Sequence, residues 1–142
     1  MAELSLQQAS AIVDGALAKA RAMKLLPMTI VVVDRNGVMK AMKREDGTGL
    51  IGPDMVFGKA FGAVSLGRSS GENATRMSGN PGLVAALSAA SGGKFIAARG
   101  AVLIFSSDGE MIGAVGAGGD TGEADEVCSA AGVAAAGLKT SA

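Results

Sequence analysis

The sequence predicts a single α+β domain in which helices cover one sheet of five mainly antiparallel strands. Short apolar runs of strand length are joined by tight turns at Asn36-Gly37 and Asp108-Gly109, which favour hairpins. Segments with helical spacing precede, separate and follow these runs. The 142 residues contain no repeat or linker, so one domain is expected to span residues 1–142. Short turns between successive strands favour an antiparallel sheet over alternating parallel strands.

The first third of the chain predicts one helix and one hairpin. Apolar residues recur at helical spacing from Ser5 to about Leu25, and Ser5 with Gln8 forms a capping-box pattern. The β-branched run Met28–Val33 is typical of a strand that is buried on both faces. After the turn, Val38–Met42 returns as the second strand.

The middle third predicts helical pieces separated by glycine-rich loops. Pro53 begins a helix that runs to about Leu66, in which Gly58 and Gly62 leave room for another backbone. The polar residues 67–79 predict a loop with about one helical turn. Asn80 then begins a further short helix, because asparagine is a good cap and proline follows it at the first helical position.

The last third predicts three strands and a closing helix. Phe95–Ala98, Val102–Phe105 and Met111–Val115 are short apolar runs of strand length. The glycine-rich break at 116–119 allows a ligand or partner to approach the backbone closely. Asp120 or Thr121 is expected to cap the helix that follows, to about residue 136.

Composition excludes several classes of function. The chain has no histidine and one cysteine, so it lacks the usual zinc and haem ligand, and we expect no metal site and no internal disulfide. Thirteen basic residues balance thirteen acidic ones, and only four residues are aromatic, which argues against nucleic-acid binding. No apolar run reaches the length of a membrane span and no secretion signal is evident, so we expect a soluble, cytoplasmic protein. Twenty-two glycines and many alanines leave a small core per residue, which favours a homo-oligomer.

Several motifs together resemble the GlcG/HbpS family, which includes the C-terminal domain of PduO-type proteins. They are VVVDRNG, REDG, GKAFGAV, SGGKFIAARG and DGEMIGAVGAGGDTGEADEVCSAAG, in this order across the chain. The resemblance implies a profilin-like or PAS-like fold with a five-stranded antiparallel sheet, assembled into dimers or larger rings. It also implies haem as a ligand, since some relatives bind haem or act on it, whereas others accompany glycolate or diol metabolism.

Two departures from the family bear on the ligand. Without histidine or tyrosine, haem iron would have only weaker or unusual ligands, such as methionine, Cys128, threonine or lysine. Relatives tend to have a Pro-Gly-Gly segment before the last hairpin, whereas this chain places the cation Arg99 there. We interpret this cation as a sign of an anionic ligand different from haem.

Three cations are candidates for a ligand clamp. Arg44 ends the second strand beside a flexible loop, where it is either a solvated strand end or a group that holds a carboxylate. Lys59 lies on a different helix face from Phe57 and Phe61, which places it in solvent or at the mouth of a pocket. With Arg99, these cations are predicted to line one hollow.

Acidic residues crowd the start of the closing helix. Favourable interaction with the helix dipole explains them without any function. Alternatively, Glu123 or Asp125, which match the acidic positions of the family's T-x-E-x-D pattern, faces the pocket with a raised pKa and acts as a general base. Cys128 is expected to be a small buried residue rather than a nucleophile, because no histidine can activate it.

Two hypotheses of different classes follow. The first is a small-ligand-binding or accessory protein, in which an anionic organic molecule, haem included, is held near a subunit interface. The predicted ligand contacts are Arg44, Lys59, Arg99, Gly118, Gly119, Asp120 and Thr121. The second is a cofactor-free isomerase, lyase or hydrolase of a small organic acid, with Glu123 or Asp125 as base and Lys59 as part of the clamp.

Overall fold

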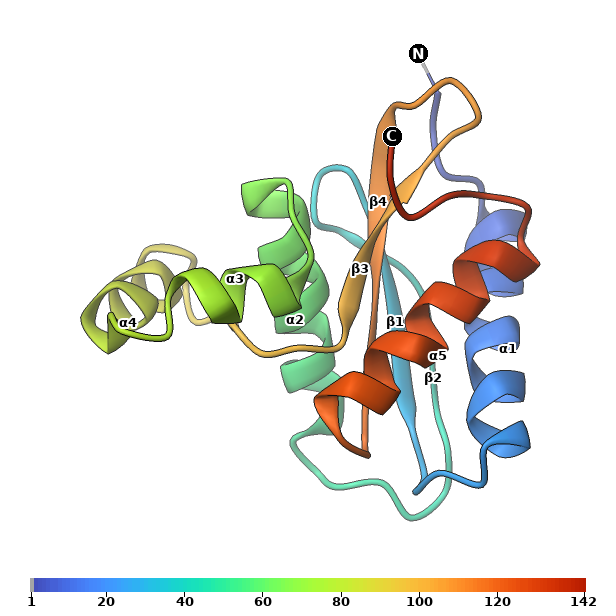
Figure 1. The fold of residues 1–142 in the computed structure, drawn as a ribbon, viewed down its shortest axis with the longest axis horizontal. Helices are drawn as coiled ribbons and strands as arrows, with labels where there is room; N and C mark the ends of the chain where they lie inside the picture. Colours follow the sequence, from blue (N-terminus) through green and yellow to red (C-terminus); the bar gives the residue numbers. More distant parts are fainter. Residues whose placement is uncertain (1) are drawn as a thin grey trace.

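The computed structural model describes residues 2–142 as one four-stranded antiparallel sheet with five helices (Figure 1). The order of the strands across the sheet is β2-β1-β4-β3. The elements are α1 (Leu6–Ala22), β1 (Thr29–Asp34), β2 (Met39–Arg44), α2 (Gly52–Leu66), α3 (Ser70–Arg76), α4 (Pro81–Ala90), β3 (Ala101–Phe105), β4 (Met111–Gly118) and α5 (Gly122–Ala135).

Strand β1 lies at the centre of the molecule, with a hydrophobic core on each face of the sheet. Ile30 and Val32 point into the core that contains α1 and α5, whereas Val31 and Val33 point into the core that contains α2. Successive side chains of a strand face opposite ways, so a strand covered on both faces needs an unbroken apolar run. This confirms the prediction that the run at 28–33 is buried on both sides.

Local signals in the sequence place the helix ends and turns correctly. Ser5 Oγ accepts a hydrogen bond from Gln8 N–H and the Gln8 side chain accepts one from Ser5 N–H, each at 3.0 Å, which completes the predicted capping box. Thr121, rather than Asp120, caps α5 through Ala124 N–H. The two hairpin turns depend on glycines with positive φ, as predicted from their Asn-Gly and Asp-Gly pairs.

The helix α2 packs closely against the segment before β3, as the glycine spacing predicted. A Cβ on Gly58 would lie 2.5 Å from Lys94 O, and one on Gly62 would lie 2.9 Å from the Phe95 ring. These contacts are too short for any side chain larger than hydrogen. The segment 94–96 therefore crosses directly over α2.

The prediction of five strands is wrong by one. Phe95–Ala98 has the composition of a strand, but it forms none, because its backbone is directed at α2 instead of a neighbouring strand. Ile96 N–H donates to Gly58 O at 3.3 Å. Gly100, with φ of 142°, then turns the chain into β3. The profilin-like or PAS-like arrangement implied by the resemblance remains a prediction.

The helices α3 and α4 form a projection beside α2 (Figure 1). The predicted single turn near residue 72 is a seven-residue helix, α3, which packs against α2 and β3. Helix α4 has no buried residue. Within residues 2–142 no helix is both long and apolar enough to cross a lipid bilayer.

Candidate functional site

The candidate residues gather at one end of the sheet, which we call the Gly118 end. Here β1 begins at Thr29, β2 ends at Arg44, β3 begins at Ala101 and β4 ends at Gly118. Thr29 pairs with Arg44 on one side and with Gly118 on the other, so these three residues form one row across three strands. The antiparallel topology therefore brings together residues that are far apart in sequence.

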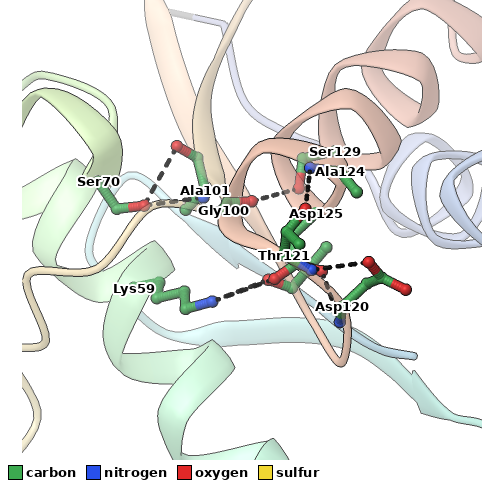
Figure 2. A network of polar contacts seen from close by, with 10 residues as sticks. Lys59, Ser70, Gly100, Ala101, Asp120, Thr121, Ala124, Asp125 and Ser129 are labelled. Carbon is green, nitrogen blue, oxygen red and sulfur yellow. Dashed lines mark hydrogen bonds and ion pairs between the residues drawn. The ribbon is translucent and has the colours of Figure 1, made fainter. Parts of the chain in front are cut away.

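A buried ion pair lies at the centre of this end (Figure 2). Lys59 Nζ is 3.6 Å from Asp125 Oδ2, and the two side chains are only 5% and 3% exposed. Lys59 Nζ also donates to Ala117 O at 3.2 Å. Since α2 covers one face of the sheet and α5 the other, this pair joins the two layers of helices beside Gly100, directly before β3.

Gly100 has no Cβ, and the ion pair occupies the space that a side chain at this position would need. A Cβ at this position would lie 2.9 Å from Lys59 Nζ and 3.3 Å from Asp125 Cβ. The other carboxylate oxygen of Asp125 accepts a hydrogen bond from Asp120 N–H at 3.1 Å, and Ser129 Oγ donates to Gly100 O at 2.6 Å. The pair and its neighbours thus hold the start of β3 against the turn into α5 (Figure 2).

Burial displaces the pKa of both partners toward the neutral form. Desolvation lowers the pKa of Lys59, opposed by the nearby Asp125 carboxylate. Desolvation also raises the pKa of Asp125, opposed by the Asp120 N–H hydrogen bond and by Lys59. Lys59 is therefore neither in solvent nor at the mouth of a pocket, the two placements that the sequence suggested, but inside the protein.

Arg99 lies at the outer surface of α5 rather than with Lys59. Its guanidinium donates to Glu126 Oε1 at 3.1 Å, and this hydrogen bond and charge raise the pKa of Arg99. Its side-chain carbons pack where Gly71 and Gly122 leave room. Glu123, the other candidate base, is exposed and adds to the field at Arg99.

Asp120 has a structural task at this end. Its carboxylate accepts hydrogen bonds from Leu26 N–H at 3.0 Å and from Thr121 N–H at 2.8 Å. These bonds lower the pKa of Asp120. Asp120 thus connects the loop after α1 to the start of α5, while Gly119 beside it is exposed.

The predicted residues share one end of the sheet but not one hollow. Arg44, which is exposed, belongs to the edge strand β2, and Arg99 directly precedes β3 at the opposite edge. Three strand spacings separate these edges, about 14 Å. A small open cavity of about 230 Å³ does lie at this end, but it is lined by Arg21, Pro27, Glu45 and Asp46.

Two threonines at the same end were missed by sequence reasoning. The hydroxyls of Thr29 and Thr48 are buried and have no hydrogen-bond partner. Thr29 is only 1% exposed, and its Oγ1 lies 2.9 Å from the position of a Cβ on Gly52, at the first turn of α2. That helix begins after Ile51 without a side-chain cap. A threonine at the start of an otherwise apolar strand was the available signal.

The chain is a single α+β domain. Its four-stranded antiparallel sheet has α1 and α5 on one face and α2 on the other, with a buried lysine–aspartate pair at one end. The family described as "Haem degrading protein HbpS-like" matches residues 4–134. The chain therefore belongs to the HbpS-like family, as its motifs suggested.

Solved structures show the same fold. The PduOC–haem complex superimposes with a TM-score of 0.86 at 22% identity, covering 99% of this chain and 100% of that one. A double mutant of HbpS from Streptomyces reticuli gives 0.80 at 27% identity, covering 94% and 87%. Protein ORFY of Klebsiella pneumoniae gives 0.84 at 23% identity, covering 96% and 93%. No curated protein matches the sequence.

Proposed function

We propose that this protein is a small-ligand-binding or accessory protein that holds an anionic organic molecule at the Gly118 end of the sheet. The observation that carries the proposal is the buried, unpartnered hydroxyl of Thr29 below the uncapped first turn of α2. A buried hydroxyl without a partner is costly, so such groups are rare unless they serve a further purpose.

The groups around Thr29 suit a carboxylate. At the start of α2, Gly52 N–H donates to Gly49 O and Met55 N–H donates to Ile51 O, each at 3.0 Å, and proline follows Gly52, so the Asp54 N–H is the group left for a ligand. The helix dipole favours a negative charge at this end. Arg44, directly opposite Thr29 in the strand register, adds a cation that binds carboxylates through two parallel hydrogen bonds. Leu50 and Ile51, 95% and 65% exposed in the loop before α2, offer apolar contacts for the rest of an organic molecule.

Not all of the remaining predicted contacts would act around this centre. Gly119 is exposed and allows close approach to the backbone, whereas Arg99 is paired with Glu126 at the far edge of the sheet and lies outside this centre. Lys59 is enclosed, so it would not contact the ligand. Its hydrogen bond to Ala117 O would instead hold the end of β4, and so the backbone around the ligand, in place.

Haem is the first ligand to test, because the family's description names it and PduOC was solved as a haem complex. For the iron of a haem, the Gly118 end leaves only weak ligands such as the methionine Met55, whose Cε lies 3.5 Å from the position of a Cβ on Gly118. The chain has no histidine or tyrosine, Cys128 is 0% exposed, and Lys59 is held by Asp125. Recognition of the carboxylates of a ligand, rather than of a metal, is what these residues support.

A second candidate function is that of a cofactor-free enzyme acting on a small organic acid. The exposed carboxylate of Glu123 beside the cation Arg99 favours it, since a base next to a clamp suits proton abstraction from an acid. Turnover of an organic acid that is lost in Glu123→Gln would support the enzyme; binding without turnover would support the accessory protein.

The test is ligand titration of matched variants. Haem is followed by its absorbance, and a panel of mono- and dicarboxylates by calorimetry. We expect Arg44→Met to weaken binding of the best ligand at least about tenfold, the loss typical of a charge-assisted hydrogen bond, while Lys40→Met, at the other end of β2, leaves it unchanged.

Thr29→Val separates binding from stability. Removing a buried unsatisfied hydroxyl should raise the free energy of unfolding by about 1 kcal/mol or leave it unchanged, yet weaken ligand binding. Unaltered affinity in both Thr29→Val and Arg44→Met would overturn the placement of the site. If haem binding gives a Soret shift that these substitutions do not affect, haem binds at another surface of the protein.

A further inference from the structure

A second cavity lies at the end of the sheet opposite to the Gly118 end, where the two hairpin turns lie (Figure 1). It has a volume of about 390 Å³, within the range of about 300–1,000 Å³ that is usual for small-molecule sites. The six residues of β1 separate it from the Gly118 end by about 20 Å. We call it the turn cavity, and its lining includes Glu3, Leu4, Asp34, Arg35, Lys40 and Ile112.

The floor of the turn cavity is apolar and firmly held. Leu4 and Ile112 line the cavity, are only 3% and 2% exposed, and belong to the core beneath it. A Cβ on Gly113 would lie 3.3 Å from Leu4 Cδ2, so this glycine lets Leu4 pack against the start of β4. Ala2 N–H donates to Glu110 Oε2 at 3.0 Å, which also holds the segment before α1. Such a floor suits a small aliphatic group.

Arg35 gives the turn cavity a cation whose hydrogen bonds are incomplete. Its Nη2 is buried and has no hydrogen-bond partner within residues 2–142. Glu110 Oε2 lies 3.8 Å from Nη2, which is too far for a hydrogen bond. A buried N–H of a charged group that lacks an acceptor is costly, so the guanidinium gains by turning toward an acceptor in the cavity that it lines. A carboxylate is the best such acceptor, because it receives two parallel hydrogen bonds from arginine.

Carboxylates lie beside this cation. Asp34 Oδ1 accepts the N–H groups of Asn36, at 2.8 Å, and of Val38, at 3.2 Å, which fixes the Asp34 side chain in the β1–β2 turn. The other oxygen, Oδ2, receives no hydrogen bond from the described part of the chain. Glu3 lines the cavity from the segment before α1 and is exposed. These oxygens suit an ammonium group, which has three N–H donors and no acceptor.

The four charged residues that line the turn cavity sum to zero charge, because Glu3 and Asp34 balance Arg35 and Lys40. A ligand with one sign of charge would meet repulsion as well as attraction there. A zwitterion, in contrast, places each of its charges near the opposite charge of the protein. Lys40 is exposed and remains in solvent, so Arg35 is the cation assigned to the ligand.

We propose that the turn cavity binds an α-amino acid with an aliphatic side chain. The ligand carboxylate binds Arg35, the ligand ammonium binds Glu3 and Asp34 Oδ2, and the aliphatic side chain lies on the floor. The two charges of an α-amino acid sit on one carbon atom, and Asp34 and Arg35 are likewise adjacent in the chain. The proposal adds a second site to the protein and does not depend on a ligand at the Gly118 end.

Calorimetric titration of the full chain with three related probes tests the class of ligand. The probes are L-leucine, isocaproate, which lacks the ammonium of leucine, and isoamylamine, which lacks its carboxylate. Any tag is placed at the C-terminus, because Glu3 and Leu4 line the cavity. We expect leucine to bind at least about tenfold more tightly than either other probe, the gain typical of one charge-assisted hydrogen bond. Isocaproate that binds as tightly as leucine, or no binding of leucine at millimolar concentration, would overturn the proposal.

Substitutions separate the two charges of the ligand. We expect Arg35→Met to weaken both leucine and isocaproate at least about tenfold, and Glu3→Gln to weaken leucine but not isocaproate. Arg35→Lys keeps the charge but not the paired donors, so it should restore binding only in part. Arg76→Met is the matched control, because Arg76 is a 59% exposed arginine that is paired with Glu72 on α3. It should bind all three probes as the wild-type protein does.

Two further readings keep the outcomes distinct. An unchanged urea midpoint for Arg35→Met would show that loss of leucine binding in this variant comes from the site and not from the fold, whereas a collapsed fold would be bypassed by the result for Glu3→Gln. Leucine binding that is lost in Thr29→Val but kept in Arg35→Met would place the amino acid at the Gly118 end and overturn the proposal. Leucine binding that needs Arg35, in a protein that binds no other carboxylate through Arg44, would support the turn cavity and contradict the proposed function alone.

Discussion

At the scale of single residues, the structure of the Gly118 end depends on two buried charged side chains, Lys59 and Asp125. Taking Lys59 and Asp125 into the interior costs several kcal/mol for each ion, and their attraction offsets this cost only with good geometry and further hydrogen bonds. Ala117 O and Asp120 N–H provide such bonds. Loss of either partner alone would leave a buried charge, at a cost of about 3–5 kcal/mol. The pair therefore fixes the position of the strand end more than it adds net stability.

The pH dependence of stability tests the surroundings of Asp125. Burial raises the pKa of this carboxyl above its ordinary value of 3.8. A raised pKa makes the folded chain bind more protons in the window above 3.8, so the contribution of Asp125 to stability is full below 3.8 and is lost as the pH rises through its folded pKa. In Asp125→Asn, which retains an acceptor for Asp120 N–H, this contribution is absent.

We therefore expect the free energy of unfolding of the wild-type protein, minus that of Asp125→Asn, to fall as the pH rises above 3.8. Urea denaturation at a series of pH values measures it. The remaining carboxylates are common to both proteins and largely cancel. A difference that grows with pH in this window would mean that attraction to Lys59, rather than burial, dominates the pKa of Asp125.

At the scale of single residues, the sequence predicted that Lys59 lies near the acidic start of α5, but it did not predict that Lys59 is buried there or that Arg44 and Arg99 lie apart from it; binding of a ligand by these residues stays a prediction. Lys59, Asp125, Asp120 and Thr121 do meet at one end of the sheet. That Lys59 is enclosed depends on Gly100, whose lack of a Cβ opens the space, and on the crossing of residues 94–96 over α2. Both features involve residues far from Lys59 in the sequence, so the spacing of residues within α2 could not predict them.

At the scale of elements, the contact between α1 and α5 depends on glycine. A Cβ on Gly132 would collide with Ile12 O and would lie 3.2 Å from Ala16 Cβ, and Gly15 faces the same contact. We expect Gly132→Ala to destabilise the protein by about 1–3 kcal/mol through overpacking, although alanine favours a helix by about 1 kcal/mol.

Gly82→Ala is the matched control for Gly132→Ala. A Cβ there would lie at an ordinary 3.7 Å from Asn80 Oδ1, so this substitution in α4 should not lower the free energy of unfolding. Thermal and urea denaturation of both variants provide the measurement. Equal stability of Gly132→Ala and the wild-type protein would show that α1 and α5 separate easily.

The elements themselves were predictable where local chemistry decides them. Helix caps, prolines and glycine turns predicted both hairpins. The same signals predicted the first residues of α1, α4 and α5, which begin at Leu6, Pro81 and Gly122, to within about one residue. The prediction of a strand at residues 95–98 failed, because the composition of a segment does not reveal which part of the protein its backbone bonds to. The isolation of α4 was equally hidden, since Val84 and Leu87 have the spacing of a helix that covers a core.

At the scale of the whole molecule, the sheet joins two cores that neither layer of helices could form alone. The strands β1 and β4 lie in the interior of the sheet and are buried along almost their full length, whereas β2 is an edge strand that is half exposed. The ion pair from α2 to α5 adds a link between the layers. Separation of either layer should therefore require loss of the central strands, so that the two cores unfold together.

Native-state hydrogen exchange in increasing urea tests this cooperativity. We expect the amides of β1 and β4 to exchange only through global unfolding, with the free energy and urea dependence of the whole domain, because both faces of these strands are covered. The amides of β2 should exchange by local opening at a lower free energy and with little dependence on urea, because this edge strand is bonded on one side only. In Lys59→Met, which leaves the Asp125 carboxylate without its cation, β1 and β4 should weaken together by a similar amount. If β1 alone kept its wild-type protection while β4 lost it, the two cores would be separate folding units and the lysine–aspartate pair would not connect them.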